Sequence, residues 1–223
     1  MFCQVHDLGL IDYGIGWQLQ KDFFSEVETS KNSHTLILCR HNPVITLGRN
    51  AHEENILFSR DDLFLKGVDL FQTERGGDVT YHGPGQIVAY PIFNLAYLKK
   101  DIHWFLRKLE DVAIDFLSEL GVNCNRRPGL TGVWVDKKKI ASIGISIRHW
   151  ITFHGMSINI KDADLADFSL IRPCGMDIEM TSLETVLAKE MQVDDLKEVL
   201  ADKFCAGFRL KALMQEEAGI WRK

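Results

Sequence analysis

The stretch RGGDVTYHGPGQ, residues 75–86, separates two β-rich runs at residues 68–73 and 87–95. Four glycines and one proline fall within these twelve residues. Glycine at this density marks places where the backbone turns sharply or comes close to something that it binds. One interpretation is a tight hairpin with a polar tip. The other is a ligand clamp, in which backbone N–H groups and two polar side chains surround a carbonyl or a phosphate. The clamp would consist of Gly76, Gly77, Gly83, Gly85, Arg75 and His82.

The stretch contains neither a GxGxxG pattern nor GxxxxGK followed by Ser or Thr. A loop that binds nucleotide phosphates is therefore not supported.

The composition favours one large globular domain over residues 1–223, because 46% of the residues are hydrophobic and can form a sizeable core. No run of about 18 apolar residues is present. The first nine residues lack the basic start and the apolar stretch of a secretory signal. We therefore predict a cytoplasmic protein without a membrane span. The net charge of -5, with both signs interspersed, disfavours nucleic acid as a partner.

The spacing of apolar residues predicts helices at residues 12–31, 103–120 and 194–208, with Gly121 ending the second. It predicts strands at residues 2–8, 35–39, 44–47, 68–73 and 79–95, a helical turn at residues 61–66 and a β-meander over residues 132–160. Thr181 and Glu184 form a capping box before a further short helix. Because the strands follow one another without regular helical crossovers, we predict an α/β fold of the α+β type. Its sheet is expected to be mixed or mainly antiparallel and flanked by helices.

Five cysteines, an odd number without a CxxC pair, fit reduced intracellular thiols better than disulfides or a zinc site. Cys174 differs from the others because it stands between Pro173 and Gly175, on a segment expected to be irregular. Cys39 and Cys205 lie in apolar stretches, where a small buried thiol is expected. Cys174 is therefore the candidate nucleophile. Its thiolate requires a nearby base or positive charge.

The run GVWVDKKKIASIGISIRHW, residues 132–150, places Lys139 at the end of an apolar strand face. Counting by twos puts it on the same side as Ala141, Ile143, Ile145 and Ile147. Two interpretations of Lys139 follow. Either its aliphatic side chain extends along the apolar face and places the amine in solvent, or its amine is partly desolvated and can act as a base near neutral pH. Lys139 and His82 are the candidate partners of the Cys174 thiolate. A metal site of His82, His154 and Cys174 is an alternative without any short ligand spacing.

Four blocks of this sequence resemble the lipoate-biosynthesis octanoyltransferases, the LipB family. The blocks are RGGDVTYHGPGQ, GLTGVWVDKKKIASIGI, FHGMSIN and PCG followed by MTSL. The resemblance implies the biotin/lipoate ligase-like catalytic fold and an acyltransferase that moves an octanoyl group from acyl carrier protein to a lysine of a lipoyl domain. The implied acceptors are the E2 subunits of 2-oxoacid dehydrogenases and the glycine cleavage H protein. The implied reaction needs no cofactor and no metal.

The resemblance also implies the residues of the site. Cys174 matches the family's acyl-thioester nucleophile, and Lys139 matches its partner lysine. In the implied reaction Lys139 takes the proton of Cys174, the thiolate attacks the thioester, and the target lysine then attacks the acyl-enzyme. Backbone N–H groups near Gly77, Gly144 or Gly175 would stabilise the oxyanion. The residues that match the substrate-binding segments are Arg75, Gly76, Gly77, Asp78, Val79, Thr80, Tyr81, His82, Ser142, Ile143, Gly144, Gly155, Met156 and Ser157.

One geometric conflict remains open. In a regular strand Ser142 and Gly144 face away from Lys139, although the resemblance puts all three around one site. Contact through backbone groups, or a β-bulge near Ser142 or Gly144, would remove the conflict.

Two other functions also remain open. The first is an ATP-dependent lipoate ligase of the same fold, which would keep a lysine at position 139 but would not need Cys174. The second is a catalytically silent protein that binds lipoyl domains or acyl carrier protein.

Docking of acyl carrier protein requires a local basic patch, because such carriers are acidic and this chain is itself net negative. The candidate residues are Lys99, Lys100, Arg126, Arg127 and Arg148.

Overall fold

The computed structural model of the protein describes residues 1–30, 33–173 and 178–215. The strands of its larger sheet are β1 (Phe2–Ile11), β2 (Ser33–His41), β6 (Gln86–Phe93), β7 (Asn125–Arg127), β8 (Leu130–Val135), β9 (Lys138–Arg148), β10 (Ile151–Asn159) and β11 (Lys211–Gln215). Within the described residues these eight strands lie in the order β11-β1-β2-β6-β10-β9-β8-β7. β1 is parallel to β2 and β11, whereas the other neighbours are antiparallel. The predicted mixed sheet is confirmed, as is the meander, which β8, β9 and β10 form.

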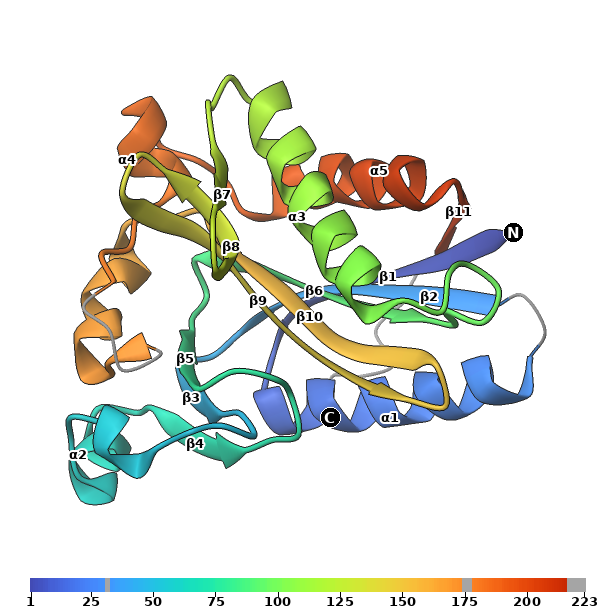
Figure 1. The fold of residues 1–223 in the computed structure, drawn as a ribbon. Coiled ribbons are helices and arrows are strands. Elements are labelled where there is room, and N and C mark those ends of the chain that lie inside the picture. The colour runs from blue at the N-terminus through green and yellow to red at the C-terminus, as the bar shows by residue number, and fades with distance from the viewer. Residues whose placement is uncertain (31–32, 174–177, 216–223) are drawn as a thin grey trace.

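A second, smaller sheet consists of β3 (Val44–Leu47), β4 (Asp69–Gln72) and β5 (Val79–His82), in the order β4-β3-β5. β3 is parallel to β4 and antiparallel to β5. The predicted helical turn forms α2 (Arg60–Leu65) beside this sheet (Figure 1). The hairpin interpretation of residues 75–86 is wrong, because β5 pairs with β3 while β6 belongs to the larger sheet. The glycine-rich stretch instead carries the chain from one sheet to the other.

Helices cover both faces of the larger sheet (Figure 1): α1 (Tyr13–Thr29) lies on one face, and α3 (Ile102–Glu119) and α5 (Lys197–Phe208) lie on the other. α1 buries Leu19, Phe23 and Val27 against the sheet. On the opposite face, buried side chains of α3 and α5 join those of the sheet in the largest hydrophobic core. The sequence predicted all three helices, because each carries an apolar stripe at helical spacing.

Gly121 ends α3 as predicted. Its φ of 84° lies in the left-handed region, its N–H donates to Ser118 O, and the N–H of Val122 donates to Leu117 O. This pair of bonds is a Schellman motif, which satisfies the last carbonyls of the helix.

The predicted capping box at Thr181 is wrong by one residue. Ser182 caps α4 (Leu183–Leu187), because its Oγ accepts from the N–H of Thr185 at 3.0 Å. The N–H of Thr181 is already bonded to Lys139 O at 2.9 Å. That bond holds Thr181 against β9 and places the first residue able to cap the helix at Ser182.

Short 3₁₀ helices complete the fold at η1 (Glu53–Asn55), η2 (Ala163–Leu170) and η4 (Asp194–Leu196). β11 was not predicted, because its five residues are all exposed and show no alternation. In the part of the chain that the structure describes, none of the helices combines the length and apolar character needed to span a membrane.

Candidate active site

A β-bulge sets the direction of Lys139. Trp134 of β8 pairs with Lys139, and Val133 pairs with Ala141, so Ile140 is an extra residue in β9. Both Ile140 and Ala141 are fully buried in the core that contains α3 and α5. The extra residue reverses the alternation of the strand. The expectation that Lys139 shares a face with Ala141 is therefore wrong.

The same bulge removes the conflict between Lys139 and the residues that follow it. Lys139, Ser142 and Gly144 all line one cavity. The bulge lies at Ile140, two residues before the nearer of the two expected positions.

The cavity encloses about 620 Å³ of empty space, part of it open to solvent. All substrate-binding residues predicted from the sequence except Tyr81 line it. The lining residues are Tyr13, Arg75, Gly76, Gly77, Asp78, Val79, Thr80, His82, Val88, Tyr90, Lys139, Ser142, Ile143, Gly144, His154, Gly155, Met156, Ser157 and Pro173.

Tyr81 points away from the cavity into the core of the smaller sheet. Its hydroxyl donates to Asp167 Oδ2 at 2.7 Å, and its ring centroid lies 5.6 Å from that of Phe168. Tyr81 therefore supports β5 instead of lining the cavity.

The segment from Arg75 to Gly77 lies directly on β9. Gly76 donates its N–H to Ile145 O at 2.8 Å. A Cβ on Gly144 would lie 2.8 Å from Gly76 O. Glycine at position 144 therefore permits this close approach of the two backbones.

The ligand clamp expected from the four glycines is only partly present. Gly76 and Gly77 line the cavity, whereas Gly83 and Gly85 are not among its lining residues. The N–H of Gly76 is taken by Ile145 O, and the N–H of Gly85 donates to Asp164 Oδ2 at 2.7 Å. Gly77 remains a candidate for the oxyanion site.

Arg75 brings a fixed positive charge to the cavity wall. The residue is 7% exposed, and its guanidinium donates to Thr46 Oγ1 at 3.0 Å and to Thr46 O at 2.5 Å. A further bond joins it to Gly76 O at 3.1 Å. Asp78 is held in a similar way by the N–H of His52 and the side chain of Asn55. Both polar side chains are thus fixed before any ligand binds.

The two histidines of the cavity wall are neutral at physiological pH. Burial lowers the pKa of His82 to about 3, and the neighbouring His41 adds to this effect. Burial also lowers the pKa of His154, although the Glu74 carboxylate, 3.6 Å from its Nε2, opposes the shift. A neutral imidazole does not supply the positive charge that a thiolate needs. This weakens His82 as the partner of Cys174.

Lys139 is the buried amine of the site. The residue is 9% exposed, and its Nζ lies 5.2 Å from the centroid of the Trp134 ring. The backbone N–H of Lys139 donates to Glu179 O at 2.8 Å, and its backbone carbonyl accepts from the N–H of Thr181. The burial favours the desolvated amine over a stem that leads to bulk solvent, whereas Lys137 and Lys138 are exposed as predicted.

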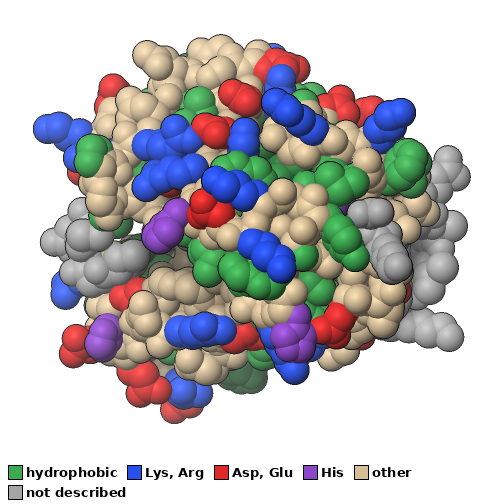
Figure 2. Space-filling model, turned by 45° about the vertical axis from the view of Figure 1, so that its right-hand side comes forward, with side chains coloured by type: hydrophobic (Ala, Val, Ile, Leu, Met, Phe, Trp, Pro, Cys, Tyr) green, Lys and Arg blue, Asp and Glu red, His purple; other side chains and the backbone are tan. Residues whose placement is uncertain are grey.

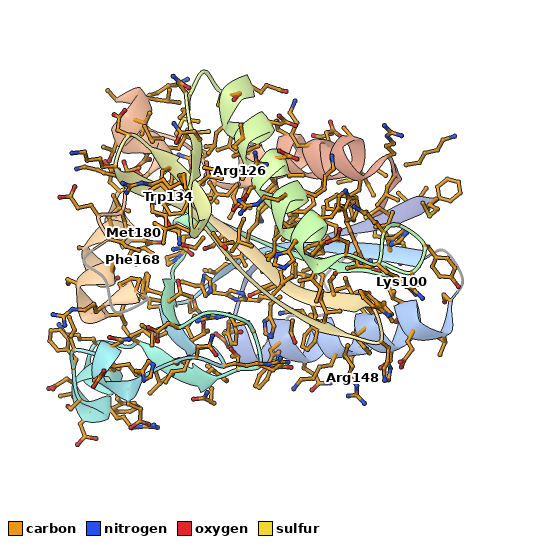
Figure 3. All side chains as sticks on the ribbon, viewed as in Figure 1. Lys100, Arg126, Trp134, Arg148, Phe168 and Met180 are labelled. Carbon is orange, nitrogen blue, oxygen red and sulfur yellow. The ribbon has the colours of Figure 1, made fainter. Side chains whose placement is uncertain are left out.

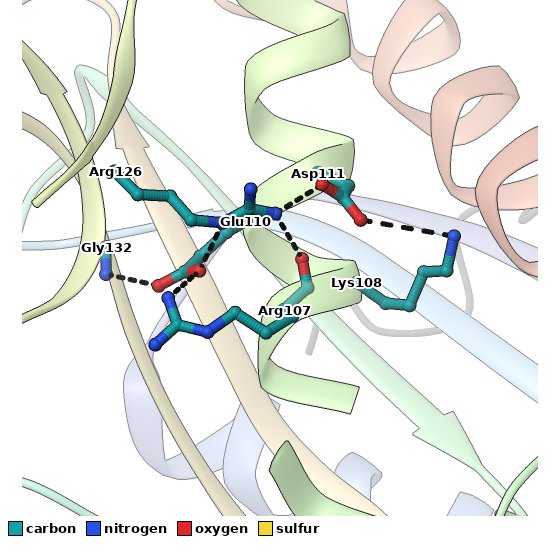
Figure 4. A network of polar contacts seen from close by, with 6 residues as sticks. All are labelled: Arg107, Lys108, Glu110, Asp111, Arg126 and Gly132. Carbon is teal, nitrogen blue, oxygen red and sulfur yellow. Dashed lines mark hydrogen bonds and ion pairs between the residues drawn. The ribbon is translucent and has the colours of Figure 1, made fainter. Parts of the chain in front are cut away.

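A network of charged side chains around Glu110 connects α3 to Arg126 of β7 and to Gly132 of β8 (Figure 4). Glu110 of α3 is completely buried and accepts from Arg107 at 2.6 Å and from Arg126 at 2.7 Å. It also accepts from the N–H of Gly132 at 3.2 Å. A Cβ on Gly132 would lie 2.6 Å from Lys139 Cε, so the glycine leaves the space that the lysine side chain occupies.

Cys174 and Gly175 lie outside the described residues. The described chain reaches Pro173, which lines the cavity, and resumes at Ile178, just before the pairing with Lys139. His82 and His154 of the alternative metal set also line the cavity. Among the described residues, no three His, Cys, Asp or Glu side chains are grouped in a way that would hold a metal ion.

Sequence reasoning did not assign the lining residues Tyr13, Val88, Tyr90 and Pro173 to the site. Tyr13 begins α1 and is far from the glycine-rich stretch in sequence. Val88 and Tyr90 lie in β6, in which all residues are buried, so no alternation marks the side that faces the cavity. Of these four residues, only Pro173 is adjacent in the sequence to a predicted catalytic or substrate-binding residue, Cys174.

Comparison with known proteins relates this chain to enzymes of protein lipoylation. The family described as Lipoyl protein ligase A/B catalytic domain matches residues 12–205. An octanoyltransferase from Thermoanaerobacter sp. (strain X514) is 43% identical over 207 residues, which cover 92% of this chain and 90% of that protein.

Solved structures show the same fold at low sequence identity. Lipoate-protein ligase A bound with ATP has a TM-score of 0.79 at 15% identity, covering 97% of this chain and 90% of that chain. Biotin protein ligase from Aquifex aeolicus has a TM-score of 0.52 at 10% identity, covering 94% of this chain and 70% of that chain. The biotin/lipoate ligase-like fold expected from the sequence is confirmed.

Proposed function

Because this chain belongs to the LipB octanoyltransferases of the lipoyl protein ligase A/B catalytic domain family, we propose that it moves an octanoyl group from acyl carrier protein to a lipoyl domain through a thioester on Cys174. The chain is an acyltransferase, and octanoyl transfer in protein lipoylation follows from the family. The proposed acceptors are lipoyl domains of E2 subunits and the glycine cleavage H protein. The observation that carries the covalent route is the buried Lys139 amine in a cavity that Pro173, the neighbour of Cys174 in the sequence, also lines.

In the first step Lys139 takes the proton of the Cys174 thiol. The thiolate attacks the carbonyl carbon of the octanoyl thioester, and the bond from that carbon to the phosphopantetheine sulfur breaks. The departing thiolate takes the proton back from Lys139. The octanoyl group is then held as a thioester on Cys174.

In the second step the amine of the target lysine attacks the same carbonyl carbon. An amide bond forms, the bond to Cys174 sulfur breaks, and Lys139 assists the removal of the amine proton. His82 is not suited to this role, because burial lowers its pKa to about 3 and leaves it a weak base. Lys139 is therefore assigned as the base in both steps.

The proposed reaction requires neither ATP nor a divalent metal, because a thioester arrives already activated. The test is octanoyl transfer from octanoyl-acyl carrier protein to a lipoyl domain in EDTA without nucleotide. A parallel mixture contains free octanoate, ATP and magnesium. We expect transfer in the first mixture, and a loss of orders of magnitude in Lys139→Ala but not in the exposed control Lys138→Ala.

Activity only in the mixture with ATP would instead identify an ATP-dependent lipoate ligase. Binding of acyl carrier protein without transfer in either mixture would identify a catalytically silent binding protein.

A further inference from the structure

Beside Lys139, a short segment of residues 179–181 takes the place of strand β10. The pairing of β10 with β9 ends at Ala141. At Lys139 the neighbour is Met180, in a parallel bridge, and both the backbone N–H and the carbonyl of the lysine bond to this segment. The backbone position of Lys139 therefore depends on residues 179–181.

The side chain of Asn159 fixes this segment. Asn159 is the last residue of β10, and it is buried. Its Nδ2 donates to Thr181 O at 3.0 Å, and the N–H of Thr181 in turn donates to Lys139 O at 2.9 Å. Asn159 is thus joined to the backbone of Lys139 through a single residue.

Behind Asn159 lies Gln86, a second buried amide. The two residues face each other across β10 and β6, and Gln86 is completely buried. Gln86 Nε2 lies 3.1 Å from Asn159 Oδ1 and 3.3 Å from Tyr81 O, whereas Gln86 Oε1 lies 3.0 Å from His82 Nδ1. A continuous chain of hydrogen bonds therefore runs from His82, on the cavity wall, to the backbone of Lys139.

Backbone carbonyls fix the orientation of both amides. Tyr81 O and Thr181 O only accept hydrogen bonds, so each must face an NH2 group. Gln86 therefore turns its oxygen to His82. Burial lowers the pKa of His82 to about 3, so its neutral ring carries the proton on Nδ1 and donates to that oxygen. Every bond of the chain then donates in the direction of Lys139.

Two buried amides are costly at this place unless each is hydrogen-bonded. Their strand neighbours Ile87 and Ile158 are fully buried apolar residues, which need no such partners. What the amides add is directionality, because each has one orientation in which its bonds are satisfied. The chain of bonds therefore fixes one arrangement of the segment that holds Lys139.

We propose that Asn159 is a positioning residue for the base of the reaction, and that Gln86 supports it. This inference rests on the proposed octanoyl transfer, in which Lys139 takes the proton of Cys174. Without the Asn159 amide, Thr181 O loses its donor, and residues 179–181 are no longer fixed against β10. The lysine that is bonded to this segment then shifts, and its amine no longer stands where the thiol requires it.

The test measures the alkylation rate of Cys174 by iodoacetamide against pH, with the modified peptide identified by mass, beside the rate of octanoyl transfer. A neighbouring positive charge lowers the pKa of a thiol. In Asn159→Leu, which keeps the branched shape and removes both hydrogen bonds, we expect the pH of half-maximal alkylation to rise toward about 8.5, as in Lys139→Ala. Octanoyl transfer is expected to fall about 10- to 100-fold, because a shift of about 1 Å in a reacting group has this effect.

Asn94→Leu is the matched control. Asn94 is also a buried amide, which accepts from the N–H of Ala96 at 3.0 Å, and it does not line the cavity. Its alkylation profile and transfer rate are expected to stay unchanged. If Asn159→Leu does not fold, Gln86→Leu breaks the chain one bond further from Lys139 and is expected to shift the profile in the same direction.

An unchanged alkylation profile in the folded variant would overturn the positioning role, even if transfer became slower, provided that the unaltered protein transfers octanoyl and that Lys139→Ala shifts the profile. Absence of octanoyl transfer by the unaltered protein would instead refute the proposed function, and this inference with it.

Discussion

At the scale of single residues, the position of the Lys139 amine depends on the absence of a side chain at Gly132. Gly132 leaves open the volume through which the lysine passes, and its φ of 135° lies in the left-handed region. Neither property is visible in the sequence, where GVWVDKKK offers three consecutive lysines. The family resemblance selected Lys139 among them, whereas counting by twos put it on the wrong face.

Gly132→Ala is therefore expected to slow octanoyl transfer. Its Cβ would lie 2.6 Å from both Lys139 Cε and Ala141 O, so the lysine must move. A displacement of about 1 Å in a reacting group can cost about 10²-fold in rate. The measurement is kcat for transfer to a lipoyl domain.

Gly129→Ala is the control for this change, because Gly129 also has a positive φ but nothing within 4 Å of a Cβ. Equal losses of kcat in the two variants would show that backbone strain, and not the displacement of Lys139, causes the effect.

At the scale of secondary-structure elements, the sequence predicted correctly those elements that their own residues specify. The apolar stripes of α1 and α3 and the glycine after α3 specify those helices without help from the rest of the chain. The bulge at Ile140 and the change of sheet after β5 depend on partners distant in sequence. For that reason neither the face of Lys139 nor the pairing of residues 79–82 followed from the pattern.

The packing of α3 against β7 and β8 depends on the network around Glu110. Glu110→Gln would remove the buried carboxylate that Arg107 and Arg126 share (Figure 4). Both arginines are partly exposed and neither is left as a buried charge, so we expect a loss of about 1.5 kcal/mol of unfolding free energy, the low end for hydrogen bonds to a charged group. Urea unfolding measures this loss.

Asp115→Asn removes an exposed carboxylate from the same helix and is expected to change stability by less than about 0.5 kcal/mol. A similar effect of both substitutions would mean that the buried network does not stabilise the fold.

At the scale of the whole molecule, the predicted basic clusters lie in different places. Figure 3 shows Trp134 and Met180, which neighbour Lys139, at one side and Lys100 and Arg148 toward the other. From Lys139 to Arg148 the strand β9 advances eight paired residues, or roughly 26 Å at about 3.3 Å per residue. Figure 2 shows several Lys and Arg side chains near one another on one face, with acidic side chains among them.

Arg127 is the best remaining candidate for docking an acidic carrier. It lies in β7, near the end of β9 that carries Lys139, whereas the side chain of Arg126 is already bonded to Glu110. Arg127→Glu is expected to raise KM for octanoyl-acyl carrier protein several-fold at low salt. The distant Arg148→Glu is the control. If KM responds equally to both, or the effect does not weaken with added salt, the carrier does not dock at Arg127.

Buried histidines make the stability of the whole fold depend on pH. Burial lowers the pKa of His34 and His41 to about 4 and that of His82 to about 3. An unfolded histidine titrates near pH 6.5, so between pH 6.5 and 4 the unfolded state binds more protons than the folded state. The free energy of unfolding must therefore fall as the pH falls through this window.

His34 lies away from the cavity and isolates one of these contributions. In His34→Gln the slope of unfolding free energy against pH is expected to decrease by up to about 1.4 kcal/mol per pH unit. Urea titrations at several pH values between 4 and 7 measure this slope. A slope identical to that of the unaltered protein would show that His34 is protonated equally in both states.

The thioester on Cys174 is the central claim, and the mass of the intact protein tests it most directly. The protein is incubated with octanoyl-acyl carrier protein in EDTA, without nucleotide and without a lipoyl domain. We predict the addition of one octanoyl group, its absence in Cys174→Ala, its presence in the buried-cysteine control Cys39→Ala, and its loss when a lipoyl domain is added. An octanoyl adduct that persists in Cys174→Ala, or transfer at the normal rate by that variant, would contradict the covalent mechanism.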